Sequence, residues 1–261
     1  MSTLSRWKGY IYLEERDRAA ERKRAEIDTF GDIDSYQELM NRPYTKRLKE
    51  EVHKRLARYR SRDQNILEIG AGISEFKEQF ELENFFVASD FVFAILNQNT
   101  SRPGLVVCDG EILPYADKSF DLVILIGVLH HLRDQSACLH EVRRVLRKGG
   151  HVFICEPHRR SLNFFYYNLR RLVIKMFGVR FLKWLIGCVT PDESQVDVKA
   201  VRRAFQQDCK IHIDTILVFR LPPLRLFKNS SLDVNISSIL DRIPVLNTCG
   251  STVFIEIEAG Q

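Results

Sequence analysis

Glycine and acidic residues follow an apolar run in the first third of this chain, in a pattern that can bind a small polar ligand. The run, residues 65–69, ends in a turn in which Gly70 and Gly72 flank Ala71. Because glycine lacks a Cβ, it can adopt positive φ and lets a ligand lie directly against the backbone. Glu68, just before the turn, offers a carboxylate to an amine or a hydroxyl group. The stretch therefore predicts a ligand-binding turn.

Three further apolar runs end in residues that can do chemistry. These are 85–90, which ends in Asp90, 104–108, which leads into Asp109, and 120–127, which leads into His130 and His131. Asp90 follows the glycine turn by about 20 residues, the distance at which an open α/β fold presents a carboxylate to a ribose. Since the carboxyl ends of parallel strands meet at one edge of a sheet, these side chains are expected to share one ligand site.

The elements that must position these residues alternate between strands and helices. The expected strands are 65–69, 85–90, 104–108, 120–127, 151–156, 211–219 and 251–258, and the expected helices are 36–40, 44–59, 75–82, 192–206 and 232–242. Short apolar runs bounded by turn residues indicate buried strands, and apolar residues at helical spacing indicate the helices. This order predicts one α/β fold.

Composition narrows the class of protein. A chain of 261 residues with 45% hydrophobic residues suits one such domain, and a net charge of +5 does not by itself indicate nucleic-acid binding. The six cysteines, at 108, 138, 155, 188, 209 and 249, show no metal-ligand spacing. No metal is therefore expected, and reduced thiols indicate a cytoplasmic protein. The first 30 residues carry charges throughout and predict no secretory signal.

Residues 66–158 resemble the core of a class I S-adenosylmethionine-dependent methyltransferase. The resemblance is carried by the motifs Glu68-Ile69-Gly70-Ala71-Gly72, Asp90, Asp109-Gly110-Glu111-Ile112-Leu113-Pro114-Tyr115, Ser119-Phe120-Asp121-Leu122-Val123 and Leu139-His140-Glu141-Val142-Arg143-Arg144-Val145-Leu146-Arg147-Lys148-Gly149-Gly150. The family usually has a third glycine where this chain has Ser74. Serine is a good helix cap, so the departure is a small one.

This resemblance implies a fold and its divisions. The fold would be a Rossmann-like, seven-stranded, mostly parallel sheet whose last strand is antiparallel. A helical N-terminal arm, residues 1–64, would precede a methyltransferase domain, residues 65–261, with a helical lid inserted at about 157–191. Such arms close over the cofactor in this family, which makes Tyr36 and Tyr44 candidate pocket residues, although ordinary packing is the favoured interpretation for each.

The resemblance also implies a cofactor, S-adenosylmethionine, with S-adenosylhomocysteine as product. The residues that would bind it are Glu68, Gly70, Ala71, Gly72, Asp90, Phe91, Asp109, Gly110, Glu111 and Ile126. In this scheme Glu68 lies near the amino group and Asp90 accepts hydrogen bonds from both ribose hydroxyls. Phe91 lies against the adenine, and Asp109 accepts a hydrogen bond from the exocyclic amine of the adenine.

A nicotinamide-dependent oxidoreductase is the first alternative, because that fold also has glycines after the first strand. A dinucleotide requires G-x-G-x-x-G to bring a helix N-terminus to its pyrophosphate. Here Glu75 occupies the place of the third glycine. Its carboxylate would repel a pyrophosphate, whereas a sulfonium cofactor tolerates acidic surroundings.

The catalytic candidates are His131, His130 and Glu156, with His158 as a further one. Methyl transfer from a sulfonium requires alignment, and a base that removes a proton from the acceptor is optional. An imidazole titrates in the useful range, but histidines at this position also serve packing. No Asn/Asp-Pro-Pro-Tyr motif follows residues 120–127, which argues against nucleobase or glutamine acceptors and leaves hydroxyl, carbon or small-amine acceptors open.

Residues 157–191 combine basic and aromatic side chains and contain no acidic residue. A substrate lid is the favoured interpretation. Peripheral contact with an anionic membrane through 159–187 is the alternative, and nucleic acid is a weaker third. The sequence therefore predicts methyl transfer to a small-molecule, saccharide or lipid-linked acceptor, most readily at oxygen. The alternatives are a membrane-associated lipid or quinone C/O-methyltransferase and a non-catalytic scaffold that binds the cofactor. Oligomeric state stays open.

Overall fold

The computed structural model describes residues 24, 27–28, 31–41, 43–80, 83–99, 104–158, 172–178, 196–205, 208–216 and 252–260. The expected helix 232–242 and most of the lid at 157–191 lie outside these residues, and so does most of the N-terminal arm before residue 31. The division into arm, domain and lid therefore stays a prediction.

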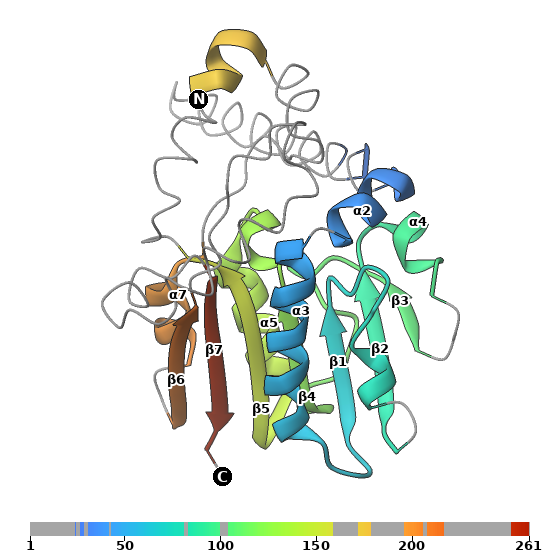
Figure 1. Ribbon diagram of the computed structural model, residues 1–261. Coiled ribbons are helices and arrows are strands. Elements are labelled where there is room, and N and C mark those ends of the chain that lie inside the picture. The colour runs from blue at the N-terminus through green and yellow to red at the C-terminus, as the bar shows by residue number, and fades with distance from the viewer. Residues whose placement is uncertain are drawn as a thin grey trace, which may run out of the picture.

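Seven strands form one sheet in the order β3-β2-β1-β4-β5-β7-β6 (Figure 1). They are β1 (Asn65–Ile69), β2 (Phe85–Asp90), β3 (Leu105–Val107), β4 (Phe120–Ile126), β5 (Leu146–Pro157), β6 (Cys209–Ile216) and β7 (Thr252–Ala259). The first five strands are parallel, whereas β7 runs antiparallel to both β5 and β6. The predicted Rossmann-like sheet with an antiparallel last strand is confirmed.

Helices connect these strands and cover the sheet. The helices whose bounds the structure describes are α2 (Ile33–Met40), α3 (Pro43–Leu56), α4 (Phe93–Leu96), α5 (Gln135–Val145) and α7 (Val198–Ala204), with short 3-10 turns at Ala57–Tyr59, Lys77–Gln79 and Leu129–His131, and residues 172–178 are helical as well. Pro43 begins α3, where a missing N–H costs nothing. Asp134 caps α5 through an oxygen that accepts a hydrogen bond from Ala137 N, and Asp197 caps α7 in the same manner.

The central strands bury side chains on both faces, as parallel strands do. Leu67 packs into one cluster with residues of α5 and α7, and Ile66 packs into the other with Val52 and Leu56 of α3. Figure 1 shows α3 in front of the sheet and α5 behind it. This double cover leaves the carboxyl ends of the parallel strands as the edge at which a ligand can bind.

Arg55 joins α3 to the C-terminal hairpin of β6 and β7. Its side chain is buried, and its guanidinium donates to Glu51 at 2.8 Å and to Asp214 at 2.5 Å. The same group lies 4.1 Å from the centroid of the Phe254 ring. Because these partners come from α3, β6 and β7, the arm helix is tied to the last strands of the sheet.

The predicted helix at 75–82 is wrong over its described residues, 75–80: the chain forms a single 3-10 turn, Lys77–Gln79, there. Ser74 adopts φ 48°, a left-handed conformation that no helix continues. Its hydroxyl donates to Glu68 instead of capping a helix. A side-chain partner in the preceding strand therefore replaces the expected cap.

Candidate active site

The glycine turn lies at the carboxyl end of β1 and is closed on two sides by side chains. Gly70 and Gly72 have φ values of +64° and +53°. A Cβ on Gly70 would overlap the side chain of Val128, and a Cβ on Gly72 would overlap the hydroxyl of Tyr36. Both positions therefore require glycine, for its φ and for its missing side chain.

Glu68 is a buried carboxyl group directly beneath this turn. The residue is 3% exposed, and Ser74 Oγ donates to its Oε2 at 2.5 Å. Burial raises the pKa of Glu68 from 4.5 to about 7, and the negative charges of Asp90 and Glu75 act in the same direction. A positively charged ligand group placed here would restore the ionised form.

Asp90 lies on the neighbouring strand β2 and holds the turn in place. Its Oδ2 accepts from Gly72 N at 2.8 Å, and its Oδ1 accepts from Val92 N at 2.7 Å. Burial raises the pKa of Asp90, and these backbone hydrogen bonds oppose the shift. Each carboxylate oxygen has two lone pairs, so the geometry is compatible with further hydroxyl donors such as those of a ribose.

Tyr36 comes from α2, above the carboxyl ends of β1 and β2 in Figure 1. Burial raises the pKa of its hydroxyl, and the charges of Asp90, Glu75 and Glu68 raise it further. The hydroxyl thus remains a hydrogen-bond donor amid carboxylates. The sequence named Tyr36 a candidate but favoured packing, because no local pattern reports how a helix of the arm docks; the side chain of Tyr44 lies outside the described residues.

The loop after β3 carries Asp109, Gly110 and Glu111, which sequence analysis assigned to the adenine. Asp109 Oδ1 accepts from Glu111 N at 3.0 Å, which shapes the turn. The Glu111 carboxylate accepts from the backbone N–H groups of Arg133 and Asp134, at 2.8 and 3.0 Å. This side chain therefore orders the segment before α5, and a ligand contact from Glu111 would come from its backbone.

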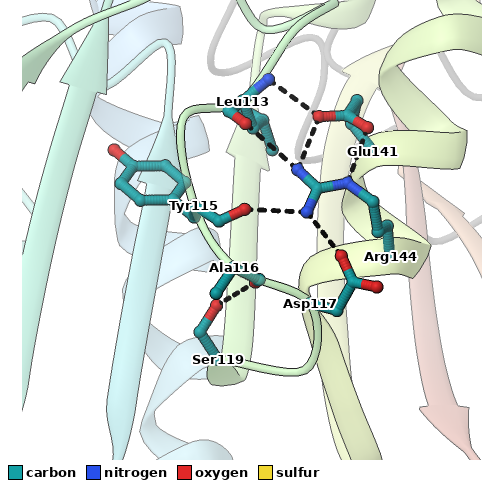
Figure 2. Close-up of polar contacts among 7 residues, drawn as sticks. All are labelled: Leu113, Tyr115, Ala116, Asp117, Ser119, Glu141 and Arg144. Carbon is teal, nitrogen blue, oxygen red and sulfur yellow. Dashed lines mark hydrogen bonds and ion pairs between the residues drawn. The ribbon is translucent and has the colours of Figure 1, made fainter.

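Arg144 of α5 fixes the continuation of that loop (Figure 2). Its guanidinium donates to the carbonyl oxygens of Leu113 and Tyr115, at 3.0 and 2.7 Å, and to Asp117 at 2.8 Å. Two further N–H groups bind the two oxygens of Glu141, each at 2.8 Å. We call these residues the Arg144 clamp. All five guanidinium donors have partners, so the loop is held against α5.

Glu156, at the end of β5, brings the catalytic candidates together. Its side chain is fully buried; Oε1 accepts from Val128 N and Leu129 N, each at 2.7 Å. Its Oε2 lies 2.7 Å from His130 Nδ1, and the His131 ring centroid lies 3.9 Å from that of His130. The sequence named these three residues separately, and the structure joins them.

The remaining predicted site residues border the same edge or lie beside it. Phe91 and Ile126 are half-buried at the ends of β2 and β4. His158 pairs with Val196 in an isolated bridge beyond β5. Ligand contacts of Phe91, Ile126 and His158 stay predictions, as do those of the other residues assigned to the cofactor.

Strand order, the antiparallel β7 and a glycine turn between the acids of β1 and β2 define a class I methyltransferase fold. The YcgJ protein from Bacillus subtilis is similar, with a TM-score of 0.56 over 81% of this chain and 99% of that one, at 13% identity. A possible histamine N-methyltransferase from Thermotoga maritima covers 95% of this chain and 96% of its own, with a TM-score of 0.51 at 15% identity. At these identities the likeness concerns the fold.

The sequence places the core within a family. Residues 67–154 match the family model described as a methyltransferase domain, so this part of the chain is a methyltransferase domain and the recognition from sequence is confirmed. A demethylmenaquinone methyltransferase from Corynebacterium urealyticum is 36% identical over 93 residues, which cover 35% of this chain and 40% of the relative. The match therefore spans less than half of that relative's length.

Metal and membrane features can be assessed for the described part of the chain. Within it, no cluster of histidine, cysteine, aspartate and glutamate is arranged to hold a metal ion. Over the same residues, no helix combines the length and apolar character that crossing a bilayer requires.

Proposed function

We propose that this chain is an enzyme that transfers the methyl group of S-adenosylmethionine to a small-molecule, saccharide or lipid-linked acceptor, most readily at oxygen. One observation carries the proposal: the buried Glu68 of β1 and the half-buried Asp90 of β2, which accepts from Gly72 N, flank a glycine turn at the carboxyl ends of the parallel strands. Burial raises the pKa of both acids, so a ligand that carries a positive charge would favour their ionised forms. S-adenosylmethionine has an ammonium group and a sulfonium that do so, and a diol that can donate hydrogen bonds to a carboxylate.

Each described residue then has a separate task. Glu68 would accept a hydrogen bond from the ammonium group, and Asp90 would accept from the ribose hydroxyls. The glycine turn would pass beneath the methionine portion, while Phe91 and the loop of Asp109 would border the adenine. S-adenosylmethionine supplies the electrophilic methyl group, so the protein's work is to align an acceptor with it and exclude water.

Calorimetric titration with S-adenosylmethionine, S-adenosylhomocysteine and NAD tests the cofactor. The first two should bind and NAD should not. Because Asp90 makes charge-assisted hydrogen bonds, Asp90→Ala should weaken binding by about 1.5–3 kcal/mol, roughly 10- to 150-fold. Glu258→Ala, which removes an exposed acid of β7, is the matched control and should leave affinity unchanged. Unchanged affinity in Asp90→Ala, or tight NAD binding, would overturn the assignment.

A second candidate is methylation of a quinol at a ring carbon; the name of the Corynebacterium urealyticum relative, a demethylmenaquinone methyltransferase, supports the class of acceptor. Tritiated S-adenosylmethionine and 2-prenyl-1,4-naphthoquinol provide the test, with the methylated position read by mass spectrometry and NMR. Label on a ring carbon would support the second candidate. Label on oxygen would support the first, and cofactor binding without transfer to any acceptor in a hydroxyl, quinol and amine panel would favour a scaffold.

We further propose a peripheral membrane contact by the segment that contains residues 172–178. Leu172, Met176 and Phe177 are 51%, 63% and 57% exposed, and Lys175 lies among them. Apolar side chains beside basic ones suit an anionic lipid surface. The variant changes Arg170, Arg171, Lys175, Arg180 and Lys183 to Gln. Salt-sensitive sedimentation with anionic vesicles, lost in this variant, would support the contact, and no sedimentation of the intact chain would leave the segment as a lid.

A further inference from the structure

Resting on the proposed function, we infer that Glu156 is a positioning residue that makes His130 Nε2 the base for a protic methyl acceptor, a hydroxyl or an acidic carbon. The observation behind this inference is the three-way anchoring of the Glu156 carboxylate, described above, together with the place of His130 at the ligand edge.

Glu156 cannot turn away from His130. Its Oε1 is held by the backbone N–H groups of Val128 and Leu129, at the start of the same 3-10 turn that carries His130. Its Oε2 is thereby presented to His130 Nδ1 at 2.7 Å. A buried carboxylate with two backbone donors is a stable acceptor, so Nδ1 carries the proton and donates it to Oε2.

The state of one imidazole nitrogen fixes the state of the other. In a neutral imidazole with a proton on Nδ1, the lone pair lies on Nε2, which is then the proton-accepting atom. When Nε2 takes up a proton, the ring becomes an imidazolium, and the adjacent Glu156 carboxylate stabilises its charge. Glu156 therefore sets the tautomer beforehand and compensates the charge afterwards.

The chain also places His130 next to the ligand-binding turn. Val128 packs against Gly70, as shown by the overlap that a Cβ there would cause, and His130 follows two residues later. Gly127 has φ +68°, which turns the chain sharply as β4 ends, and its missing side chain faces His130 Cε1. The His130 side chain is 13% exposed, so the ring is mostly enclosed and a small part of it is accessible.

A proton acceptor at this place specifies the class of substrate. For a hydroxyl acceptor, the oxygen forms a bond to the methyl carbon, the sulfur–methyl bond breaks, and its electron pair returns to sulfur. The hydroxyl proton passes to His130 Nε2 and then to water, so charge balances. For a quinol, His130 Nε2 takes the hydroxyl proton, and the ring carbon forms the bond to the methyl carbon as the sulfur–methyl bond breaks. The ring-carbon proton then leaves to water and the oxygen is reprotonated, which restores the aromatic quinol. A neutral amine attacks through its own lone pair and needs no base beforehand.

Nitrogen NMR tests the tautomer in the full-length chain. Uniform ¹⁵N labelling of histidine, with S-adenosylhomocysteine added, allows long-range ¹H–¹⁵N correlation, and loss of one pattern in His130→Gln assigns the ring. The wild-type spectrum should show His130 protonated at Nδ1 and unprotonated at Nε2 when neutral. Glu156→Gln should convert it partly or wholly to the other tautomer, whereas His140→Gln, an exposed residue of α5, should leave the pattern unchanged.

Transfer to 2-prenyl-1,4-naphthoquinol supplies the catalytic readout. His130→Gln should lower methyl incorporation about 100-fold or more while S-adenosylhomocysteine affinity stays within about twofold. A wild-type His130 that carries its proton on Nε2, or a spectrum that Glu156→Gln does not alter, would overturn the inference. The tautomer readout needs no acceptor, so it decides even if the quinol is not turned over. Failure of S-adenosylhomocysteine to bind would instead count against the proposed function.

Discussion

The Arg144 clamp and the Glu68 site both place a charged side chain against the backbone, but they compensate the charge differently. Arg144 donates with all five of its N–H groups, to two carbonyl oxygens and two carboxylates. Glu68 is more deeply buried, and the acids Asp90 and Glu75 face it, while Ser74 and Lys77 oppose their effect. The charge of Arg144 is fully compensated within the fold, whereas a charge on Glu68 is not.

This difference separates scaffold from site. A fully hydrogen-bonded guanidinium stabilises the loop it holds and gains nothing from a ligand. A buried carboxyl group near other acids is destabilised until a cation arrives, so part of a ligand's binding energy comes from relieving it. Variants in the clamp should therefore lower stability, whereas variants around Glu68 should alter cofactor affinity and its dependence on pH.

The largest effect should come from Arg144→Met. It leaves the carbonyl oxygens of Leu113 and Tyr115 without their donor, and it frees Glu141 from its ion pair. We expect the free energy of unfolding to fall by about 2–4 kcal/mol, measured by urea denaturation. Arg147→Met, which removes a more exposed guanidinium bound to Asp121, is the control and should cost about 1 kcal/mol or less. A loss below that of the control would contradict the clamp.

The second effect is a pH dependence of cofactor affinity that originates in Glu68. With a pKa of about 7 in the free protein, the ionised fraction rises from about 0.1 at pH 6 to about 0.75 at pH 7.5. Binding of S-adenosylhomocysteine should therefore strengthen by about eightfold across this window, as measured by calorimetry. The free protein should show the opposite trend: because the unfolded chain releases this proton near pH 4.5, stability falls as pH rises toward 7.

Glu68→Gln is the matched variant for this titration. It keeps the shape of the side chain and removes the ionisation, so affinity should be low and nearly constant between pH 6 and 7.5. A pH profile that survives in Glu68→Gln would show that another group titrates.

The smallest effect should come from Ser74→Ala. The Ser74 hydroxyl stabilises the Glu68 carboxylate, so its removal raises the pKa of Glu68 and weakens cofactor binding near pH 7 by about two- to fivefold. Ser119→Ala removes a hydroxyl that donates to the carbonyl of Ala116 within the loop held by the clamp (Figure 2), and affinity should stay as it was. Equal losses in the two serine variants would erase the distinction between site and scaffold.

Sequence predicted the parts of this molecule that local patterns control. The bounds of β1 and β2 agree residue for residue with the expected runs, because apolar strands that end in glycine or aspartate leave a sharp signal. The start of β5 at Leu146 was missed: Lys148, Gly149 and Gly150 look like a turn, yet the register of β4 shifts and pairing begins earlier. The shift arises from the pairing of β4 with β5, so the residues of β5 alone do not predict where that strand begins.

Contacts between distant segments account for what the sequence could not predict in the site. The sequence identified Glu156 and His130 separately, each as a residue near the end of a strand. Their contact depends on β4 and β5 being neighbours in the sheet with the observed register, which the sequence alone does not show. The position of Tyr36 over Gly72 requires the docking of α2. The contact of the Glu111 carboxylate with the backbone before α5 also joins segments that are distant in the sequence.

The antiparallel strand β7 also determines when this fold can be completed during synthesis. β5 pairs with β7 over His151–Pro157, and β6 pairs with β7, so β6 joins the sheet through a strand made after it. A ribosome-bound chain that has not yet released residues 252–260 therefore presents β5 as an open edge, the kind of edge that favours misassembly. The partners of the Glu156 carboxylate all come from the segment that follows β4, so its contact with His130 does not require that last strand.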